Sequence, residues 1–168
     1  MADAYIRPYE PADQGPIEWL YARTPPAGRV YVGPASIPTE LERIPDNYEA
    51  FWVAVEPTSD GDAVIGMLAV AAIGAPFGVP EPAFIDRSIR AARVHWLLVA
   101  PERQRRGIGR RLVDAAIAWA RANGYEALLL DTTTEQQAAV AFYEALGFSE
   151  VGRSTVRRWE LVWFKLAL

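Results

Sequence analysis

Two nearly continuous apolar runs, separated by one amphipathic segment, place the strongest constraint on how this chain can fold. Residues 94–99 are almost all apolar, as is typical of a strand buried on both faces, and Pro101 ends this strand. A helix is predicted from about Ile108 until Asn123-Gly124, and residues 127–131 predict a second buried strand. The second half of the chain is therefore organised around two buried strands with a helix between them.

Weaker patterns extend this alternation of strands and helices, an α/β or α+β order, to both ends of the chain. Asp13 is a candidate N-cap for a helix that runs through Tyr21, and Gly147 is a candidate C-cap for a later one. Expected strands cover residues 5–8, 51–55, 63–72 and 157–168, expected helices cover 39–43 and 135–146, and expected loops cover 24–38 and 74–86. Turn residues at 58–62 predict a hairpin between two of the strands.

The composition fits one soluble domain over residues 1–168 and disfavours several functions. Of the 168 residues, 51% are hydrophobic, enough for a core. Without cysteine and with a single histidine, His95, the chain is not expected to bind a metal. A net charge of −4 argues against general nucleic-acid binding. Lacking a basic leader and a membrane-length apolar run, the chain is expected to be cytoplasmic and outside the membrane.

The junction between the first buried strand and the helix reads Gln104-Arg105-Arg106-Gly107-Ile108-Gly109. Glycine weakens a helix, so this pair indicates either a bend or the close approach of another molecule. A helix N-terminus attracts anions, and Arg105, Arg106 and Arg110 could add positive charge there. Alternatively, Gly107 only turns the chain and the arginines form a solvated face. A P-loop is excluded because no Lys-Ser/Thr follows, and the dinucleotide fingerprint lacks its third glycine.

Two motifs resemble those of the GNAT (GCN5-related) N-acetyltransferases. The family signature is Gln/Arg-x-x-Gly-x-Gly/Ala after a strand that ends in Val-x-Pro, and here Val99-Ala100-Pro101 precedes the sequence at 104–109. A second family element, Ala-x-x-x-Tyr-x-x-x-Gly-Phe, is matched by Ala139, Tyr143 and Gly147-Phe148. The two motifs have the family's order and separation, so together they are more specific than either alone.

The resemblance implies a single GNAT-like domain with acetyl-CoA as co-substrate and no metal. Its mixed central sheet would have about six to seven strands, with splayed parallel central strands and about four flanking helices. The pyrophosphate would lie on the signature loop, and the pantetheine between residues 94–99 and 128–131. The implied contacts are Leu97, Leu98, Val99, Gln104, Arg105, Arg106, Gly107, Ile108, Gly109, Arg110, Gln136, Ala139 and Phe142. Gln136 stands where the family often has Asn, so the amide chemistry is retained.

Acetyl transfer to an amine needs a neutral amine, stabilisation of an oxyanion and a proton for the departing thiolate. Tyr143 matches the family tyrosine that supplies the proton, because tyrosine, with a pKa of about 10, stays protonated at neutral pH. The alternative for Tyr143 is an ordinary core aromatic. For the oxyanion, the resemblance implies a backbone N–H near Leu97 to Val99.

His95 is the candidate general base. It is the only side chain with an unperturbed pKa near neutrality, and some family members carry a base at this position. The alternative is a half-buried histidine bonded to a carbonyl. If the strand alternates without a bulge, one face carries His95, Leu97 and Val99, and the other carries Val94, Trp96 and Leu98.

The acceptor is open from the sequence. The resemblance places its site among residues 16–45 and 74–90, and a small-molecule amine or a peptide or protein amine would fit the chemistry. The preferred function is an N-acetyltransferase with direct attack in a ternary complex, and the alternative is a non-catalytic acyl-CoA-binding or regulatory domain. Residues Trp159, Leu161 and Trp163 in the last strand are either an exposed edge for a homodimer or part of the core.

Overall fold

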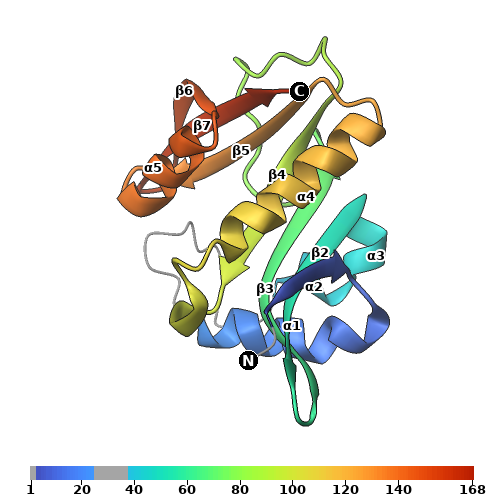
Figure 1. Ribbon diagram of the computed structural model, residues 1–168. Coiled ribbons are helices and arrows are strands. Elements are labelled where there is room, and N and C mark those ends of the chain that lie inside the picture. The colour runs from blue at the N-terminus through green and yellow to red at the C-terminus, as the bar shows by residue number, and fades with distance from the viewer. Residues whose placement is uncertain (1–2, 25–37) are drawn as a thin grey trace.

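The computed structural model, which describes residues 3–24 and 38–168, contains one seven-stranded mixed sheet (Figure 1). The strand order is β1-β2-β3-β4-β5-β7-β6. The strands are β1 (Tyr5–Pro8), β2 (Ala50–Thr58), β3 (Gly61–Ala72), β4 (Ala91–Val99), β5 (Ala127–Thr133), β6 (Ser149–Val156) and β7 (Trp159–Ala167). The helices are α1 (Gln14–Arg23), α2 (Thr39–Glu42), α3 (Ile44–Asn47), α4 (Ile108–Ala122) and α5 (Gln137–Ala145), with 3-10 turns η1 (Pro11–Asp13) and η2 (Pro101–Arg103). The mixed α+β class, the strand number and the β2–β3 hairpin are confirmed.

Strands β4 and β5 are parallel and separate after a short shared register. Only three residue pairs join them, of which Arg93 and Leu129 are the last. Beyond Arg93, β4 continues along β3 to Val99, whereas β5 continues along β7, so the two strands diverge in Figure 1. The splayed parallel strands expected from the resemblance are therefore present. Beyond Arg93, β4 has no β5 residues paired to its free edge.

A bulge in β4 breaks the side-chain alternation expected for this strand. Leu98 pairs with Met67 and His95 with Ala69, so three steps on β4 oppose two on β3. Trp96 takes up the extra residue with a φ of 55°, which is rare for a residue with a large side chain. The two expected faces, one with His95 and one with Trp96, therefore do not hold across the bulge.

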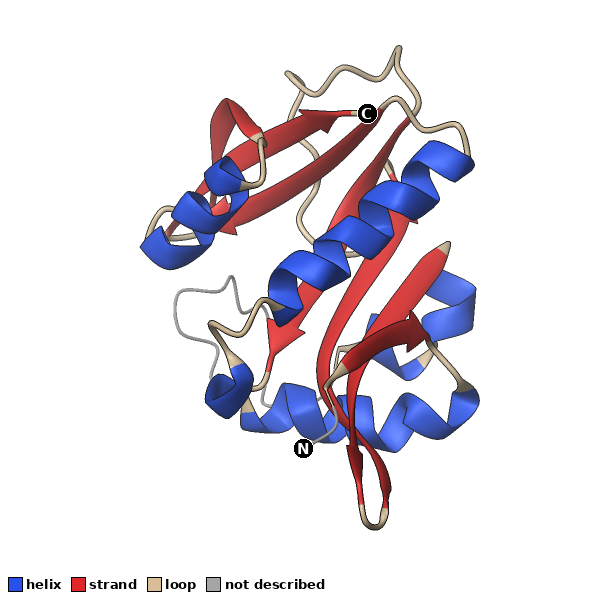
Figure 2. Ribbon diagram, in the orientation of Figure 1, coloured by secondary structure: helices blue, strands red, loops and turns tan. Residues whose placement is uncertain are grey.

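Helix α4 covers one face of the sheet, while α1, α2 and α3 lie on the other (Figure 2). Its apolar stripe is buried against β1–β4, and the side chains involved are Leu112, Val113, Ala116 and Ala120. Burying each large apolar side chain contributes about 1.5–3 kcal/mol, so the stripe holds the start of α4 against the end of β4. On the opposite face, α1 buries Ile17 and Leu20. The expected helix boundaries at 108 and 122 are confirmed.

Asp13 caps the chain differently from the N-cap expected for α1. Its side chain accepts the Glu10 N–H at 2.8 Å, in the capping box of η1, and makes no cap bond to α1. Asp13 also receives two hydrogen bonds from Arg7, at 2.6 and 2.8 Å. The carboxylate therefore joins the first strand to the first turn. Most of the loop expected at 24–38 lies outside the described residues.

The C-terminal hairpin corrects two expectations. Residues 157–158 form a turn rather than the start of a strand, and β6, which has little apolar pattern, precedes that turn. Because β7 pairs with β5 on one side and β6 on the other, it has no free edge. Leu161 and Trp163 are fully buried, which confirms the core alternative for these two residues, while Trp159 is half-buried. The exposed edge expected at this strand is wrong.

Candidate functional site

The start of α4 presents free backbone donors and open space. Gly107 is the N-cap with a φ of 77°, and a Cβ added there would meet no described atom within 4 Å. The N–H groups of residues 107–110 donate no hydrogen bond to a described residue, and Arg111 is the first to bond, to the Gly107 carbonyl at 3.1 Å. Four free N–H groups and the helix dipole favour an anion, so the junction fits a pyrophosphate.

Gly109 brings the two sequence motifs into contact. A Cβ at Gly109 would lie 3.5 Å from Phe142 Cζ and 3.9 Å from Val99 Cγ2. The end of β4, the start of α4 and the inner face of α5 therefore meet at a single point. A Cβ at Gly109 would therefore make ordinary van der Waals contacts, whereas Gly107 is favoured as glycine by its positive φ.

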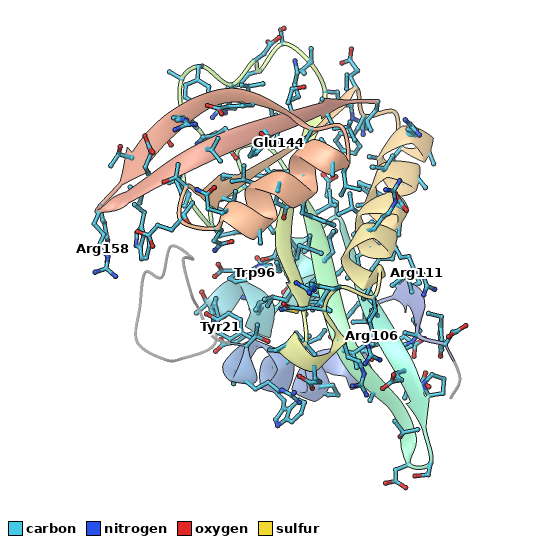
Figure 3. All side chains as sticks on the ribbon, turned by 60° about the vertical axis from the view of Figure 1, so that its left-hand side comes forward. Tyr21, Trp96, Arg106, Arg111, Glu144 and Arg158 are labelled. Atoms are coloured by element: carbon cyan, nitrogen blue, oxygen red, sulfur yellow. The ribbon has the colours of Figure 1, made fainter. Side chains whose placement is uncertain are left out.

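The residues around the α4 start are polar and mostly exposed. The Gln104 amide donates to the Val99 carbonyl at 3.1 Å and fixes the loop to the end of β4. Arg110 lies 3.8 Å from Asp114, and Arg105 has a φ of 61°. Figure 3 shows Arg106 near the same end of α4. The predicted ligands Gln104–Gly109 and Arg110 are thus grouped around the free N–H donors, and acetyl-CoA contact with them stays a prediction.

Helix α5 places Tyr143 beside the diverging strand β5. Tyr143 is buried, and its ring contacts those of Phe142, Phe148 and Phe164 at centroid distances of 5.3, 5.8 and 6.2 Å. Burial, and then the charge of Asp131, raises the pKa of the Tyr143 phenol well above its ordinary value. The hydroxyl has no hydrogen-bond partner in the described part of the chain, so it is a protonated donor without an acceptor.

The remaining predicted contacts on α5 lie at its first turn. Gln136 is the N-cap residue, and its side-chain oxygen accepts from Thr132 Oγ1 at 3.0 Å. This bond ties the end of β5 to the start of α5. Ala139 is partly exposed one turn further on, while Leu97 is partly exposed and Leu98 buried on β4. These residues flank the divergence of β4 and β5 from both sides.

His95 lies in an aromatic environment on β4. Its ring is 5.5 Å from that of Phe77 and 6.0 Å from that of Tyr48, and its Nε2 is buried without a hydrogen-bond partner among the described residues. Burial, and then the charge of Arg93, lowers the pKa of His95 to about 3. The expected bond to a carbonyl is not seen at Nε2. His95 is therefore neutral at physiological pH, able to accept a hydrogen bond but only a weak base.

Two aromatic residues that the sequence did not single out complete this side of β4. Trp96 Nε1 donates a hydrogen bond to the hydroxyl of Tyr48, a residue that lies just before β2. Trp96 also meets Tyr21 of α1 edge to face, with centroids 5.7 Å apart, and both are labelled in Figure 3. The β4 bulge explains why Trp96 was missed, because it brings Trp96 and His95, expected on opposite faces, to the same side against Tyr48. We call Tyr21, Tyr48, Phe77, His95 and Trp96 the aromatic wall.

Two further observations concern ligands and membranes. Over residues 3–24 and 38–168, no group of three or more His, Cys, Asp or Glu side chains is arranged to hold a metal ion. None of the helices in these ranges is both long and apolar enough to cross a bilayer.

Comparison with known proteins agrees with this geometry. Residues 16–148 match the family described as "Acetyltransferase (GNAT) family". Human N-acetyltransferase 8 is 30% identical over 149 residues, which are 86% of this chain and 59% of that protein, so the chain spans little more than half of that relative. The Salmonella typhimurium [ribosomal protein bS18]-alanine N-acetyltransferase is 40% identical over 62 residues, 37% of this chain and 40% of that protein.

Solved structures share the fold over nearly the whole chain. Arabidopsis thaliana NAA60 in complex with acetyl-CoA superposes with a TM-score of 0.76 at 14% identity, covering 99% of both chains. A GCN5-related N-acetyltransferase from Kribbella flavida gives a TM-score of 0.71 at 22% identity, covering 98% of both. The family match covers most of the sequence, and the solved structures share its fold. This chain therefore belongs to the GNAT acetyltransferase family.

Proposed function

We propose that this protein transfers the acetyl group of acetyl-CoA to a primary amine by direct attack within a ternary complex. The observation that carries the proposal is the meeting of Val99, Gly109 and Phe142 where β4 and β5 diverge. The free N–H donors belong to the α4 start, and Tyr143, with its protonated hydroxyl, directly follows Phe142 on α5. This proximity supports a cofactor anchor and a proton donor within one site.

Acetyl-CoA would supply an activated acetyl thioester. The N–H groups of residues 107–110 bind its pyrophosphate, and the arginines nearby add charge–charge attraction. The pantetheine lies along the free edge of β4 after Arg93, where β5 no longer pairs with the strand. N–H groups on that edge near Leu97 to Val99 would stabilise negative charge on the acetyl oxygen, and the absence of β5 pairing beyond Arg93 supports this role.

Tyr143 acts as the general acid. Its raised pKa keeps the phenol protonated through the physiological range, so a proton is available when the thiolate departs. Because the hydroxyl has no partner among the described residues, it is free to donate to sulfur. Proton donation by a general acid contributes roughly 10²–10⁴-fold to the rate of such a step.

His95 accepts a hydrogen bond from the attacking amine or from a water beside it. The proton that the amine nitrogen loses on attack passes through this water to solvent, and solvent returns a proton to the Tyr143 phenolate after the thiolate has been protonated. The buried, unpartnered Nε2 supplies the acceptor, and the pKa of about 3 keeps the ring neutral. This role needs only a hydrogen bond, so a strongly basic imidazole is unnecessary. The aromatic wall would then form part of the acceptor site.

A primary amine is the acceptor class that the relatives support. The name of the Salmonella typhimurium relative specifies an alanine of ribosomal protein bS18, and a NatC complex of the same fold was solved with a Gag peptide and CoA, with a TM-score of 0.72. Those acceptors belong to those proteins. For this chain, both a small-molecule amine and the amine of a peptide or protein fit the proposed chemistry.

The test is calorimetric titration with acetyl-CoA and CoA, followed by a thiol-release screen over small amines, amino acids and peptide N-termini. We expect binding of both nucleotides and thiol release with at least one amine class. Binding without release across the panel would instead favour a non-catalytic acyl-CoA-binding domain. Absence of binding would overturn the proposal, because the α4 start would then only turn the chain.

A further inference from the structure

A buried arginine lies where the two central strands separate. The Arg93 side chain is only 3% exposed, and each of its three guanidinium nitrogens donates at least one hydrogen bond. It donates to Asp131 Oδ1 on β5 from Nε at 3.2 Å and from Nη2 at 2.5 Å. Its Nη1 donates to the Val79 carbonyl at 2.5 Å and lies 3.4 Å from Glu81 Oε1. A buried charge with this many partners holds them at defined distances.

The partners of Arg93 come from three separate segments, namely β5, β7 and the loop that precedes β4. Arg93 is the last β4 residue that pairs with β5, and Asp131 is the second residue of β5 beyond that pair. The guanidinium also stacks over the Trp163 ring of β7, 4.6 Å from its centroid, and Trp163 is the register partner of Asp131. The ion pair therefore spans the point where the two strands diverge, and the stacking on Trp163 ties it also to β7, the other neighbour of β5.

The same cluster holds the loop that precedes β4. Glu81 accepts the Gly74 N–H at 3.2 Å and lies 3.3 Å from Arg87 Nη2, so the loop from 73 to 90 closes on itself around this carboxylate. Nearby, Gly78 packs on the ring of His95, since a Cβ there would lie 3.5 Å from His95 Cε1. A shift of Arg93 would thus reach both Asp131, beside Tyr143, and the loop against His95.

We propose that the Arg93–Asp131 pair is a positioning device for the reaction centre, which sets the separation of β4 and β5 and aligns Tyr143 with the free edge of β4. Arg93 is a positioning residue because it acts through Asp131, Val79 and Glu81. The expected effect on catalysis rests on the proposed function. The expected effect on the spacing of β4 and β5 does not, because it can be tested in a protein without turnover.

The experiment uses charge-matched variants, so that an unpaired buried charge does not dominate the result. The test double variant is Arg93→Met with Asp131→Asn, and Arg93→Lys is the conservative variant that keeps the positive charge. The control is Arg7→Met with Asp13→Asn. Like the test pair, Arg7 and Asp13 form a close ion pair, at 2.6 Å, with a carboxylate that is only 5% exposed, but this pair joins β1 to η1 instead of β4 to β5. The readouts are the dissociation constant for CoA, and KM for acetyl-CoA and kcat measured well below the unfolding temperature.

A positioning role predicts that both Arg93 variants weaken CoA binding and raise KM for acetyl-CoA about tenfold or more, with a fall in kcat, while the control stays within about twofold. A role in stability alone would reduce the folded fraction and the apparent kcat, and would leave KM and the dissociation constant unchanged. That outcome, or wild-type constants in the charge-matched double variant, overturns the proposal.

Hydrogen exchange separates failure of this inference from failure of the proposed function. If the wild-type protein neither binds CoA nor releases thiol, the proposed function fails, and the inference is decided by amide exchange in residues 94–99 and 129–133. Faster exchange there in Arg93→Lys than in the Arg7 control supports the positioning device. Equal exchange in the two variants rejects it.

Discussion

The two sides of the diverging end of β4 are built from different chemistry. At the start of α4, the candidate groups are backbone N–H donors, and the two glycines leave room beside them or allow the turn. At the aromatic wall, the functional surface consists of side-chain rings, arranged edge to face around His95. The backbone N–H donors at the α4 start are preorganised for an anion. The shape of the aromatic wall, in contrast, changes with the substitution of any of its rings.

This contrast predicts that damage to the first side abolishes cofactor binding and that damage to the second changes acceptor use and stability. Anion binding at the α4 start depends on the helix dipole and on the backbone geometry, to which all residues of α4 contribute. The aromatic wall depends on individual ring contacts, and each contributes modestly to the stability of the fold. Four variants, taken in order of expected effect, test the distinction.

Gly107→Trp gives the largest expected effect on cofactor binding. The indole would fill the open space in front of the free N–H donors, and the φ of 77° adds strain. We expect acetyl-CoA binding to weaken roughly 100-fold or more, equivalent to about 2.7 kcal/mol, in a calorimetric titration. Gly124→Trp is the matched control, because Gly124 has a φ of 73° at the far end of α4. Equal loss of binding in both variants would contradict an anion site at Gly107.

Tyr143→Phe tests the junction between the two sides. It removes the proposed proton donor and keeps the ring packing, so kcat should fall roughly 10²–10⁴-fold while the affinity for acetyl-CoA changes little. Initial rates of thiol release and a parallel titration measure the two quantities. Tyr125→Phe serves as the control, since that hydroxyl bonds Glu49 away from the divergence. A full-rate Tyr143→Phe enzyme would rule out Tyr143 as the acid.

His95→Phe tests the aromatic side through pH dependence. The pKa of His95 falls from 6.5 in the unfolded chain to about 3 in the native protein, so the unfolded state binds more protons between these values. Native stability from this group is complete above pH 6.5 and is lost as the pH falls toward 3, by about 1.4 kcal/mol per pH unit at most. Denaturant unfolding at pH 7 and pH 5 should show this loss in the wild-type protein and less of it in His95→Phe. Identical pH slopes would mean that His95 is not a buried neutral group.

Tyr48→Phe has the smallest expected effect on turnover. It removes the acceptor for the Trp96 indole N–H and should cost about 1–3 kcal/mol of unfolding free energy. If Trp96 lines the acceptor site, KM for the amine rises severalfold while the affinity for acetyl-CoA stays unchanged. Phe51→Leu, which alters a ring that packs on Tyr48 without touching this hydrogen bond, is the comparison variant. A changed affinity for acetyl-CoA in Tyr48→Phe would show that the two sides are coupled.

Much of the fold followed from periodicity and from helix and turn residues. The apolar stripe of α4, the terminating Asn123-Gly124 and the hairpin between β2 and β3 are local signals, so they were predicted with nearly correct bounds. Strand β6 was missed because none of its residues is buried, so it lacks the apolar alternation that marks a strand. Placing β6 at the sheet edge also moved Trp163 from the expected edge into the core.

The candidate site divides in the same way. Gly107, Gly109 and Tyr143 could be chosen from their motifs, because the backbone conformation and helix position they require are local. Tyr48 could not be chosen, since it precedes β2 and meets Trp96 only after the sheet has formed. Arg93 was likewise hidden, because its importance depends on Asp131, 38 residues later in the chain.

The sequence by itself determined the turn at the α4 start, which it predicted as an anion site, and the order of the elements around it, because glycine conformation and apolar periodicity act over a few residues. Only the tertiary structure decided how β4 and β5 separate, where the bulge turns Trp96, and that His95 is neutral. Those properties depend on burial and on contacts between distant segments, such as the ion pair of Arg93 with Asp131. Desolvation and strand register exist only in the folded chain, so no local pattern could encode them.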